Sequence, residues 1–236
     1  MRVSVIIPAL NEEQLLLRAI DSVSRFAAEV LVVDGASGDR TVEIAGRAAT
    51  RILSGSRGRA PQLNCGARAA EGDILLFLHA DCALGRGAAE AIAGALADPA
   101  VVGGCFSLRV DSEATAMRWV GFGSNLRARF LGLPYGDQAL FVRRRDFEAA
   151  GGFHDIPLME DVDLVLRLRR RGRLVCLPET VTTSPRHWES RGPTLTTLLN
   201  WIALLLFLAG VPAERLAPFY WRVRGISQAV GPGSAR

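Results

Sequence analysis

The chain has 236 residues, and 49% of them are hydrophobic, which suits one large domain, or one domain with an appendage, around a sizeable core. The formal net charge is only +4, so the composition does not require a nucleic-acid partner. All 28 basic residues are Arg, which we attribute to codon usage, so phosphate binding is considered only for particular arginines.

The cysteines indicate the compartment. They are widely spaced and form no C-x-x-C pair: Cys65, Cys82, Cys105 and Cys176. This spacing argues against a zinc site and against a disulfide framework, and it fits a reducing compartment. A strand begins almost at the first residue, without the features of a signal peptide. We therefore expect a cytoplasmic protein.

The first hundred residues alternate between short apolar runs and segments with helical periodicity. We expect Asn11 to cap the first helix. In chain order the predicted elements are strand 3–7, helix 12–26, strand 30–33, helix 39–49, strand 51–53, a helix with Pro61 in its first turn and Gly72 at its end, strand 75–81 and helix 87–97. This alternation predicts an α/β fold with a mostly parallel sheet covered by helices on both faces.

The second half is less regular. Its predicted elements are strand 101–110 with a bulge at Gly103-Gly104, an aromatic and basic stretch 112–133, loop 135–138, strand 139–142, a turn at Gly151-Gly152, helix 159–171 and strand 174–177. No G-x-G-x-x-G follows the first strand, and the chain contains no G-x-x-x-x-G-K-[ST]. A dehydrogenase and a P-loop enzyme therefore lose their main support.

The stretch Leu75 to Asp81 carries the first candidate site. It reads as a strand buried on both faces that ends on His79 and Asp81, whose side chains can hold a metal ion or a ribose. Ligands of open α/β sheets bind beyond the carboxyl ends of the strands. The alternative is that Asp81 caps the next helix and His79 is a loop residue with no ligand.

Five motifs follow one another in a fixed order. They are Pro8-Ala9-Leu10-Asn11-Glu12-Glu13, Val32-Val33-Asp34-Gly35-Ala36-Ser37, Asn64-Cys65-Gly66 with Arg57 or Arg59 before it, His79-Ala80-Asp81, and Glu160-Asp161-Val162-Asp163-Leu164. In this order and at strand ends and helix starts, they resemble the family-2 glycosyltransferases, which share the GT-A nucleotide-sugar fold. The likeness covers about residues 3–185. Within the family, the G-R-A-x-Q-x-N-x-G-A stretch and the H-A-D triplet are most similar to a small group linked to arsenosugar biosynthesis.

The resemblance implies a domain organisation and a reaction. Residues 1–190 would form the GT-A domain, with a nucleotide-binding half (1–100) and an acceptor and catalytic half (101–190), and residues 191–236 would form a hydrophobic helical tail. The implied enzyme is an inverting, metal-assisted glycosyltransferase of the hexosyltransferase type. It would move sugar from a nucleotide-diphosphate sugar to a hydroxyl of a small-molecule or lipid acceptor. The alternative is a non-catalytic nucleotide-sugar-binding or membrane-scaffold protein on the same fold.

The resemblance also implies the donor site. Asp34 would hydrogen-bond the nucleotide base, and Asn64 belongs to the same set of motifs. The loop containing Pro8, Asn11 and Glu12 leads into a helix N-terminus, which favours a nearby phosphate or ribose. Arg57 or Arg59 would pair with the base or the diphosphate, because a guanidinium binds phosphate in a bidentate manner; the alternative for both is plain surface charge.

Metal binding is expected at the H-A-D triplet. Asp81 matches the last Asp of the family's D-x-D motif, which would hold Mn²⁺ or Mg²⁺ together with diphosphate oxygens. His79 replaces the first Asp, which removes one negative charge and tilts the choice towards Mn²⁺. His187 is a further candidate ligand, because a late His completes the metal site in some relatives; its alternative is a surface histidine.

Asp161 matches the family's catalytic base, with Glu160 beside it. A carboxylate within hydrogen-bond reach of the acceptor hydroxyl can take its proton. Together with Asp163, these side chains place three acids in one helical turn. Repulsion would raise one pKa while the helix N-terminus would lower it, and the alternative role for all three is compensation of the helix dipole.

The tail has no charged residue from Gly192 to Ala213, and its apolar centre is 201–211. Aromatic and Arg residues follow at Phe219, Tyr220, Trp221, Arg222 and Arg224. We expect a helix at a membrane surface, on the inner face of the cell membrane; a core or homodimer helix and a true span are the alternatives.

Overall fold

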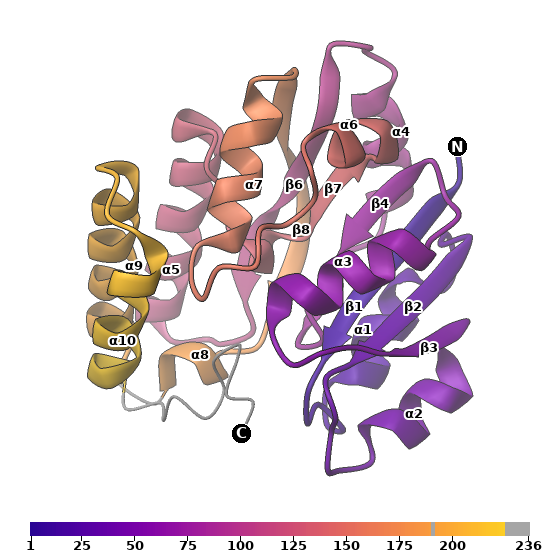
Figure 1. Ribbon diagram of the computed structural model, residues 1–236, viewed down its shortest axis with the longest axis horizontal. Coiled ribbons are helices and arrows are strands. Elements are labelled where there is room, and N and C mark those ends of the chain that lie inside the picture. The colour runs from indigo at the N-terminus through magenta and orange to yellow at the C-terminus, as the bar shows by residue number, and fades with distance from the viewer. Residues whose placement is uncertain (190–191, 225–236) are drawn as a thin grey trace.

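The computed structural model describes residues 1–189 and 192–224. One mixed sheet runs through the molecule (Figure 1), with strand order β3-β2-β1-β4-β7-β6-β8-β5. The strands are β1 Val3–Ala9, β2 Glu29–Asp34, β3 Arg51–Ser54, β4 Ile74–Phe77, β5 Cys82–Leu84, β6 Val101–Val110, β7 Leu140–Arg143 and β8 Arg173–Thr183. The helices are α1 Leu16–Val23, α2 Thr41–Ala48, α3 Arg59–Ala69, α4 Ala88–Leu96, α5 Thr115–Leu126, α6 Arg144–Ala149, α7 Glu160–Arg169, α8 Arg186–Glu189, α9 Pro193–Leu208 and α10 Ala213–Arg224, with a π-helical turn η1 at Arg127–Leu131 and a 3₁₀ turn η2 at Gly136–Gln138.

The sheet changes direction near its middle. The pairs β3-β2, β2-β1 and β1-β4 are parallel, whereas β7 lies antiparallel to both β4 and β6. Beyond it, β6 and β8 are parallel and β5 is antiparallel to β8. Parallel pairs outnumber antiparallel ones, which confirms the predicted α/β class with a mostly parallel sheet. The sequence pattern did not indicate β5 or the full length of β8.

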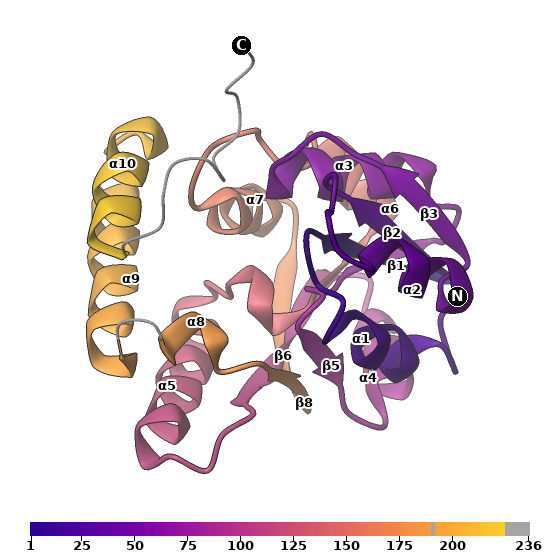
Figure 2. The same cartoon turned by 90° about the horizontal axis from the view of Figure 1, so that it is seen from below.

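Helices cover both faces of the sheet, as Figure 2 shows from below. Alternate residues of each strand point to opposite faces, so the strands feed two separate core clusters. In β1, Val3, Val5 and Ile7 pack with α1, α2 and α4 in one cluster, while Ile6 packs with α3, α6 and α7 in the other. Burial on both faces explains why β1, β2 and β4 are nearly continuous apolar runs.

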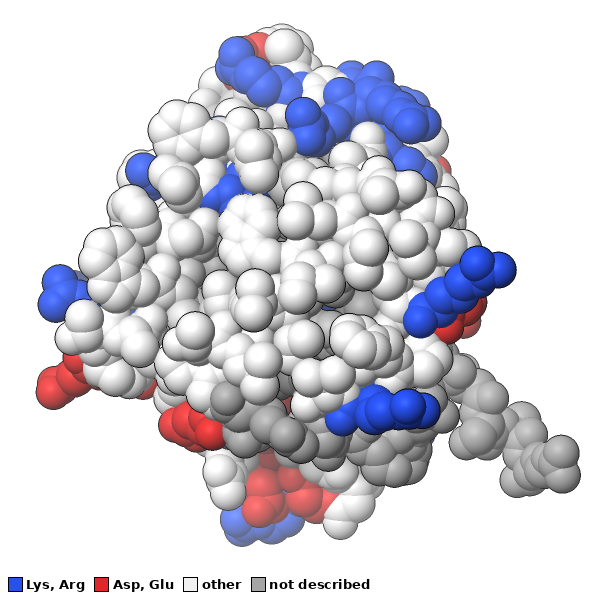
Figure 3. Space-filling view, turned by 90° about the vertical axis from the view of Figure 1, so that its left-hand side faces the viewer, with Lys and Arg blue, Asp and Glu red and all other residues white. Residues whose placement is uncertain are grey.

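The C-terminal helices lie along the second half of the sheet domain. The inward face of α9 buries Leu199, Ala203 and Leu204, which join the second core cluster together with Tyr220 of α10. The outward face of α9 is apolar and exposed, and Figure 3 shows few charged side chains there. In the part of the chain that the structure describes, none of the helices has the length and hydropathy that a membrane span requires.

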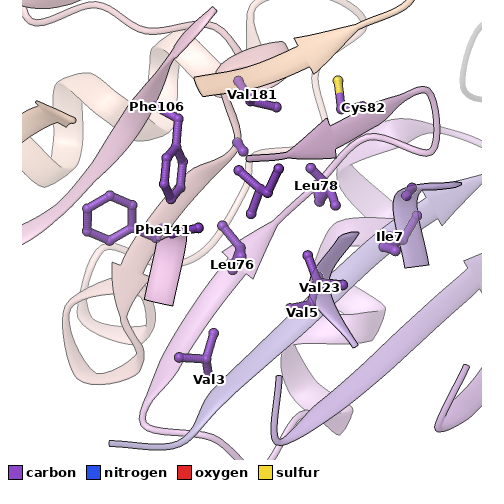
Figure 4. Packing of buried hydrophobic residues seen from close by; sticks show 14 of the residues in the cluster. Val3, Val5, Ile7, Val23, Leu76, Leu78, Cys82, Phe106, Phe141 and Val181 are labelled. Atoms are coloured by element: carbon purple, nitrogen blue, oxygen red, sulfur yellow. The ribbon is translucent and has the colours of Figure 1, made fainter. Parts of the chain in front are cut away.

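The first core cluster extends across the junction of the two halves (Figure 4). It brings Leu76 and Leu78 of the β4 segment against Phe106 of β6 and Phe141 of β7. The glycines of β6 allow this close approach, because a Cβ at Gly103 would clash with the carbonyl oxygen of Phe141. The register of β6 against β8 shifts beside Gly103, as predicted, and again after Phe106.

Candidate active site

A cavity of about 470 Å³ opens beyond the carboxyl ends of β1 and β4. Its wall combines the loop after β1, the start of α3, the loop between β4 and β5, η2, the start of α7, and parts of α8, α9 and α10. Sites of α/β sheets form at this edge, because the loops that leave parallel strands meet there. The cavity is therefore lined by segments that are spread along the described chain, from Pro8 to Trp221.

The loop between β4 and β5 places His79 and Asp81 at the cavity. Backbone bonds hold it: Cys82 N donates to His79 O at 3.0 Å, and Ser184 N donates to Asp81 O at 3.1 Å. One ligand atom each of His79, Asp81 and Cys82 lie within 4.8 Å of one another. These three side chains are close enough to share one metal ion.

The protonation states select the ligands from this group. Burial lowers the pKa of His79 to about 3, helped by the positive charge of Arg59 and by His187, so the ring is neutral and can offer a nitrogen lone pair. Burial and the nearby Asp81 raise the pKa of the Cys82 thiol well above its ordinary value, so this group stays protonated. The donors left are a carboxylate and an imidazole, a set that fits a divalent cation.

The acidic pair at the start of α7 faces the same cavity. Asp161 Oδ2 accepts a hydrogen bond from Gly136 N at 2.6 Å, and its Oδ1 accepts one from Val162 N at 2.7 Å. Glu160 is 6% exposed in its side chain and pairs with Arg59 at 3.1 Å. Burial raises the pKa of Glu160, and the charge of Asp161 adds to the effect while Arg59 opposes it.

Asp163 belongs to a different environment from Asp161. Its Oδ2 lies 2.6 Å from Arg167 Nη2 and 3.0 Å from His154 Nδ1, and it does not line the cavity. Two positions along a helix point in different directions, which separates the two acids. The first turn of α7 therefore contains two carboxylates that face the cavity, Glu160 and Asp161, and a third, Asp163, that forms ion pairs outside it.

Gly136 lies between the candidate metal ligands and the acidic pair. A Cβ built on this glycine would lie 2.8 Å from His79 Nε2 and 3.4 Å from Asp161 Oδ2. The absence of a side chain thus lets η2 pass between the β4 loop and the start of α7. Two motifs that are far apart in the sequence meet at this one residue.

Other residues that the sequence singled out also line the cavity: Pro8, Glu12, Arg57, Arg59 and His187. Glu12 Oε2 pairs with Arg186 Nη2 at 2.6 Å, and the same guanidinium lies 4.0 Å from Asp81 Oδ2. The ring of His187 stacks edge-on against that of Trp188, with the centroids 5.0 Å apart. The structure thereby brings the N-terminal loop, the β4 loop and α8 together.

Three of the predicted donor-site residues do not line the cavity. Asn11 has a φ of +56° and does not cap α1, which begins later at Leu16; instead its Oδ1 accepts a bond from Gly38 N at 2.8 Å. The carboxylate of Asp34 accepts bonds from the backbone N–H groups of Ala36 and Ser37. The side-chain amide of Asn64 exchanges two hydrogen bonds with the backbone of Phe153. Each of them stabilises a loop.

Sequence reasoning missed several residues of the cavity wall. Gln62 is 5% exposed, and its Nε2 donates to Ala9 O at 2.9 Å and to Val33 O at 2.7 Å, which ties α3 to the ends of β1 and β2. Asn200 of α9 accepts hydrogen bonds from Tyr135 and Tyr220. These contacts join segments distant in sequence, so no local pattern signals them.

Asp137 is the most unusual of the missed residues. Its Oδ1 is buried and has no hydrogen-bond partner among the described residues. Burial raises the pKa of Asp137 to about 6, with Arg127 opposing and Asp161 and Asp81 adding to the effect. A carboxyl with a perturbed pKa in a cleft is a candidate functional residue, and the available sequence signal was an acid in the loop that leads into strand β7.

Comparison with known proteins identifies a family and solved structures that resemble this chain. The family model described as glycosyl transferase family 2 matches residues 4–150. No match was found among curated proteins. The mannosyltransferase PcManGT from Pyrobaculum calidifontis, solved with GDP-Man and Mn²⁺, is similar in structure with a TM-score of 0.63 and 22% identity, over 97% of this chain and 70% of that one.

Two further solved structures share the fold. TarS 1-349 of S. aureus, in complex with UDP-GlcNAc, has a TM-score of 0.62 and 17% identity, over 97% of this chain and 74% of that one. Glucosyl-3-phosphoglycerate synthase from Mycobacterium tuberculosis, in complex with Mn²⁺, UDP and glucosyl-3-phosphoglycerate, has a TM-score of 0.58 and 20% identity, over 89% of this chain and 81% of that one. These likenesses confirm the predicted GT-A fold.

Proposed function

Because this chain belongs to glycosyl transferase family 2, we propose that it transfers a hexosyl group from a nucleotide-diphosphate sugar to an acceptor hydroxyl with inversion. The observation that carries the proposal is the meeting of two motifs in one cavity. His79 and Asp81 from the β4 loop and Glu160 and Asp161 from α7 face the same space of about 470 Å³. That volume lies in the range of ligand pockets.

Asp161 is proposed as the general base. Its two backbone donors, Gly136 N and Val162 N, orient the carboxylate and leave further lone pairs to accept a proton. The acceptor oxygen attacks the anomeric carbon, its proton passes to Asp161, and the bond from that carbon to the diphosphate breaks. The nucleoside diphosphate leaves with the electron pair. One base and direct displacement lead to inversion at the anomeric carbon.

Asp81, with His79 or His187, would hold a divalent cation, which supports the predicted use of Mn²⁺ or Mg²⁺. Such an ion stabilises the negative charge on the departing diphosphate when it is bound. Arg59 adds positive charge to the same wall, and Arg186 lies behind it, although each already pairs with a carboxylate, Glu160 and Glu12 respectively. Arg57 lines the cavity nearby and is a further candidate for the diphosphate.

The nucleotide base is proposed to bind near the ends of β1 and β2, against Pro8 and Glu12. Asp34 ends β2 in this region, and its contact with the base remains a prediction. The acceptor is proposed to be a small molecule or a lipid that enters beside Tyr220 and Trp221. The resemblance to the arsenosugar-linked group would narrow the identity of this acceptor, and it also remains a prediction.

Binding and turnover of a panel of UDP-sugars and GDP-sugars, with Mn²⁺, with Mg²⁺ and with EDTA, test the proposal. We expect one nucleotide sugar to raise the melting temperature in a metal-dependent manner, because a ligand that binds only the folded state stabilises it. Asp81→Ala should remove the metal-dependent part. Failure of every nucleotide sugar to bind with either metal would refute the proposal.

A matched pair of variants separates catalysis from binding. Asp161→Asn should lower turnover by about a hundredfold to ten-thousandfold while donor affinity stays the same. Asp163→Asn is the control, because that acid lies two positions away and pairs with Arg167 outside the cavity. Normal turnover by Asp161→Asn would exclude this residue as the base, and normal binding with no turnover by the wild type would favour the non-catalytic alternative.

A further inference from the structure

One face of the molecule carries most of the exposed large hydrophobic side chains of the described residues. We define the apolar face as the outward sides of α5, η1, α9 and α10. Its most exposed members are Phe130 (77%), Trp119 (67%), Leu205 (60%), Phe122 (57%), Leu198 (55%) and Phe219 (55%). Packing of α5 and α10 against α9 makes this one surface, and Figure 3 shows it with charged side chains mainly at its edge.

The fold itself does not need this surface to be apolar. The inward sides of the same helices are already buried, through Met117 and Val120 of α5 and through Leu199 and Leu204 of α9. Six large side chains that are more than half exposed present roughly 600 Å² of apolar area, at the upper end of what monomeric soluble proteins leave uncovered. A surface of this kind marks an interaction site.

Charge selects the partner. From 115 to 131 the chain has no acid and three Arg, of which Arg127 is buried; α9 has no charge, and α10 has Glu214 as its single acid. Arg118, Arg215 and Arg222 are exposed, and none of them takes part in a salt bridge among the described residues. A second copy of this face would offer these cations few acids to pair with, whereas an anionic surface would neutralise them.

We propose that the apolar face docks on an anionic lipid bilayer. The exposed side chains of α5 and α9 would enter the boundary between headgroups and acyl chains, as in helices that lie in the plane of a membrane. Trp119 suits that depth, because its ring is amphipathic. Arg118 and Arg222 can extend their charged ends to the headgroups while their stems stay in the apolar region.

Docking in this orientation fixes the distance between the cavity and the bilayer. α9 and α10 present Leu205 and Phe219 outward, and they present Asn200, Tyr220 and Trp221 to the cavity wall. One layer of helix, about 10 Å thick, therefore separates the bilayer from the cavity. The interaction does not depend on the proposed transferase activity and is measured without it.

Sedimentation of the full chain with phosphatidylcholine vesicles, with and without phosphatidylglycerol, tests the proposal. We expect binding to the anionic vesicles that weakens as salt rises. Phe122→Ser with Leu205→Ser should weaken it by on the order of a hundredfold, because each exposed side chain contributes the burial of one large apolar group. Arg118→Gln with Arg222→Gln should weaken it by on the order of tenfold, and on anionic vesicles only.

A control variant and the oligomeric state decide between the explanations. Leu17→Ser removes an exposed leucine of α1, outside the apolar face, and should leave vesicle binding unchanged. Light scattering should show a monomer before vesicles are added. A dimer that Phe122→Ser and Leu205→Ser dissociate would overturn the proposal, since the face would then bind a second copy. Absence of vesicle binding, or an equal loss in Leu17→Ser, would overturn it as well.

Discussion

Replacing Asp137 by Asn should stabilise the protein at high pH and have a smaller effect at low pH. The folded chain raises the pKa of this carboxyl to about 6 from an ordinary value of 3.8, because its buried Oδ1 has no partner and Asp161 and Asp81 lie near it. An acid with a raised pKa binds its proton more tightly in the folded state than in the unfolded state. Its contribution to stability is therefore retained at low pH and is lost as pH rises from about 4 to 6.

The size of the effect follows from the two pKa values. They differ by about 2.2, and one pKa unit corresponds to about 1.4 kcal/mol, so ionisation costs the fold at most about 3 kcal/mol above pH 7. At pH 5 the penalty is about half developed. The Asn side chain cannot ionise, so its gain in unfolding free energy should be larger at pH 8 than at pH 5 by about 1.4 kcal/mol, a factor of ten in the equilibrium constant.

Urea unfolding of Asp137→Asn and the wild type at pH 5 and pH 8, with EDTA present, measures this difference. EDTA is needed because a cation held by Asp81 would also stabilise the ionised Asp137. Asp155→Asn is the control for the loss of a carboxylate from the same cavity, since Asp155 lines it but is exposed. An equal gain at both pH values, or a loss at pH 8, would mean that Arg127 keeps Asp137 ionised and would refute the reasoning.

Two further changes test how the site and the tail are built. Gly136→Ala would place a methyl carbon 2.8 Å from His79 Nε2 and 3.4 Å from Asp161 Oδ2. Turnover should fall at least about tenfold, because small displacements of catalytic groups are costly. Gly123→Ala, whose added methyl group meets nothing within 4 Å, is the control, and equal kinetics of the two variants would contradict this geometry. Removing residues 192–236 should unfold the domain or lower its melting temperature sharply, because the second core cluster loses Leu199 and Leu204. A single large-to-small change at such a site already costs about 2–5 kcal/mol. An unchanged melting temperature would show that the tail is separable, as its hydropathy pattern suggests.

The arrangement of the first half follows from local pattern. Runs such as 30–33 and 74–77 have no polar residue, which is required of strands buried on both faces, and their spacing leaves room only for short helices between them. The end of the second run is enough to predict that His79 and Asp81 lie at a ligand site, and both line the cavity. The acidic turn of α7 is equally visible, because Glu160, Asp161 and Asp163 stand together at the start of a segment with helical apolar periodicity.

The second half is less predictable, because its strands pair over long distances. β7 enters the sheet between β4 and β6 in the opposite direction, and no feature of 140–143 specifies that place. Prediction from sequence has the same limit in the tail, because a stretch without charged residues predicts membrane contact along its whole length. In the fold, Leu204 is 1% exposed and Leu205 is 60% exposed, and only packing against the sheet domain separates them.

The types of group in the site follow from the sequence alone, namely an imidazole and a carboxylate after one strand and an acidic pair at one helix start. Tertiary packing selects which groups meet. It turned Asp34 and Asn64 towards nearby backbone, it brought Asp137 beside Asp161, and it gave Asp161 its two backbone donors. The physical reason is that side-chain types and periodicity are local properties, whereas burial, hydrogen-bond partners and pKa depend on segments that only the folded chain brings together.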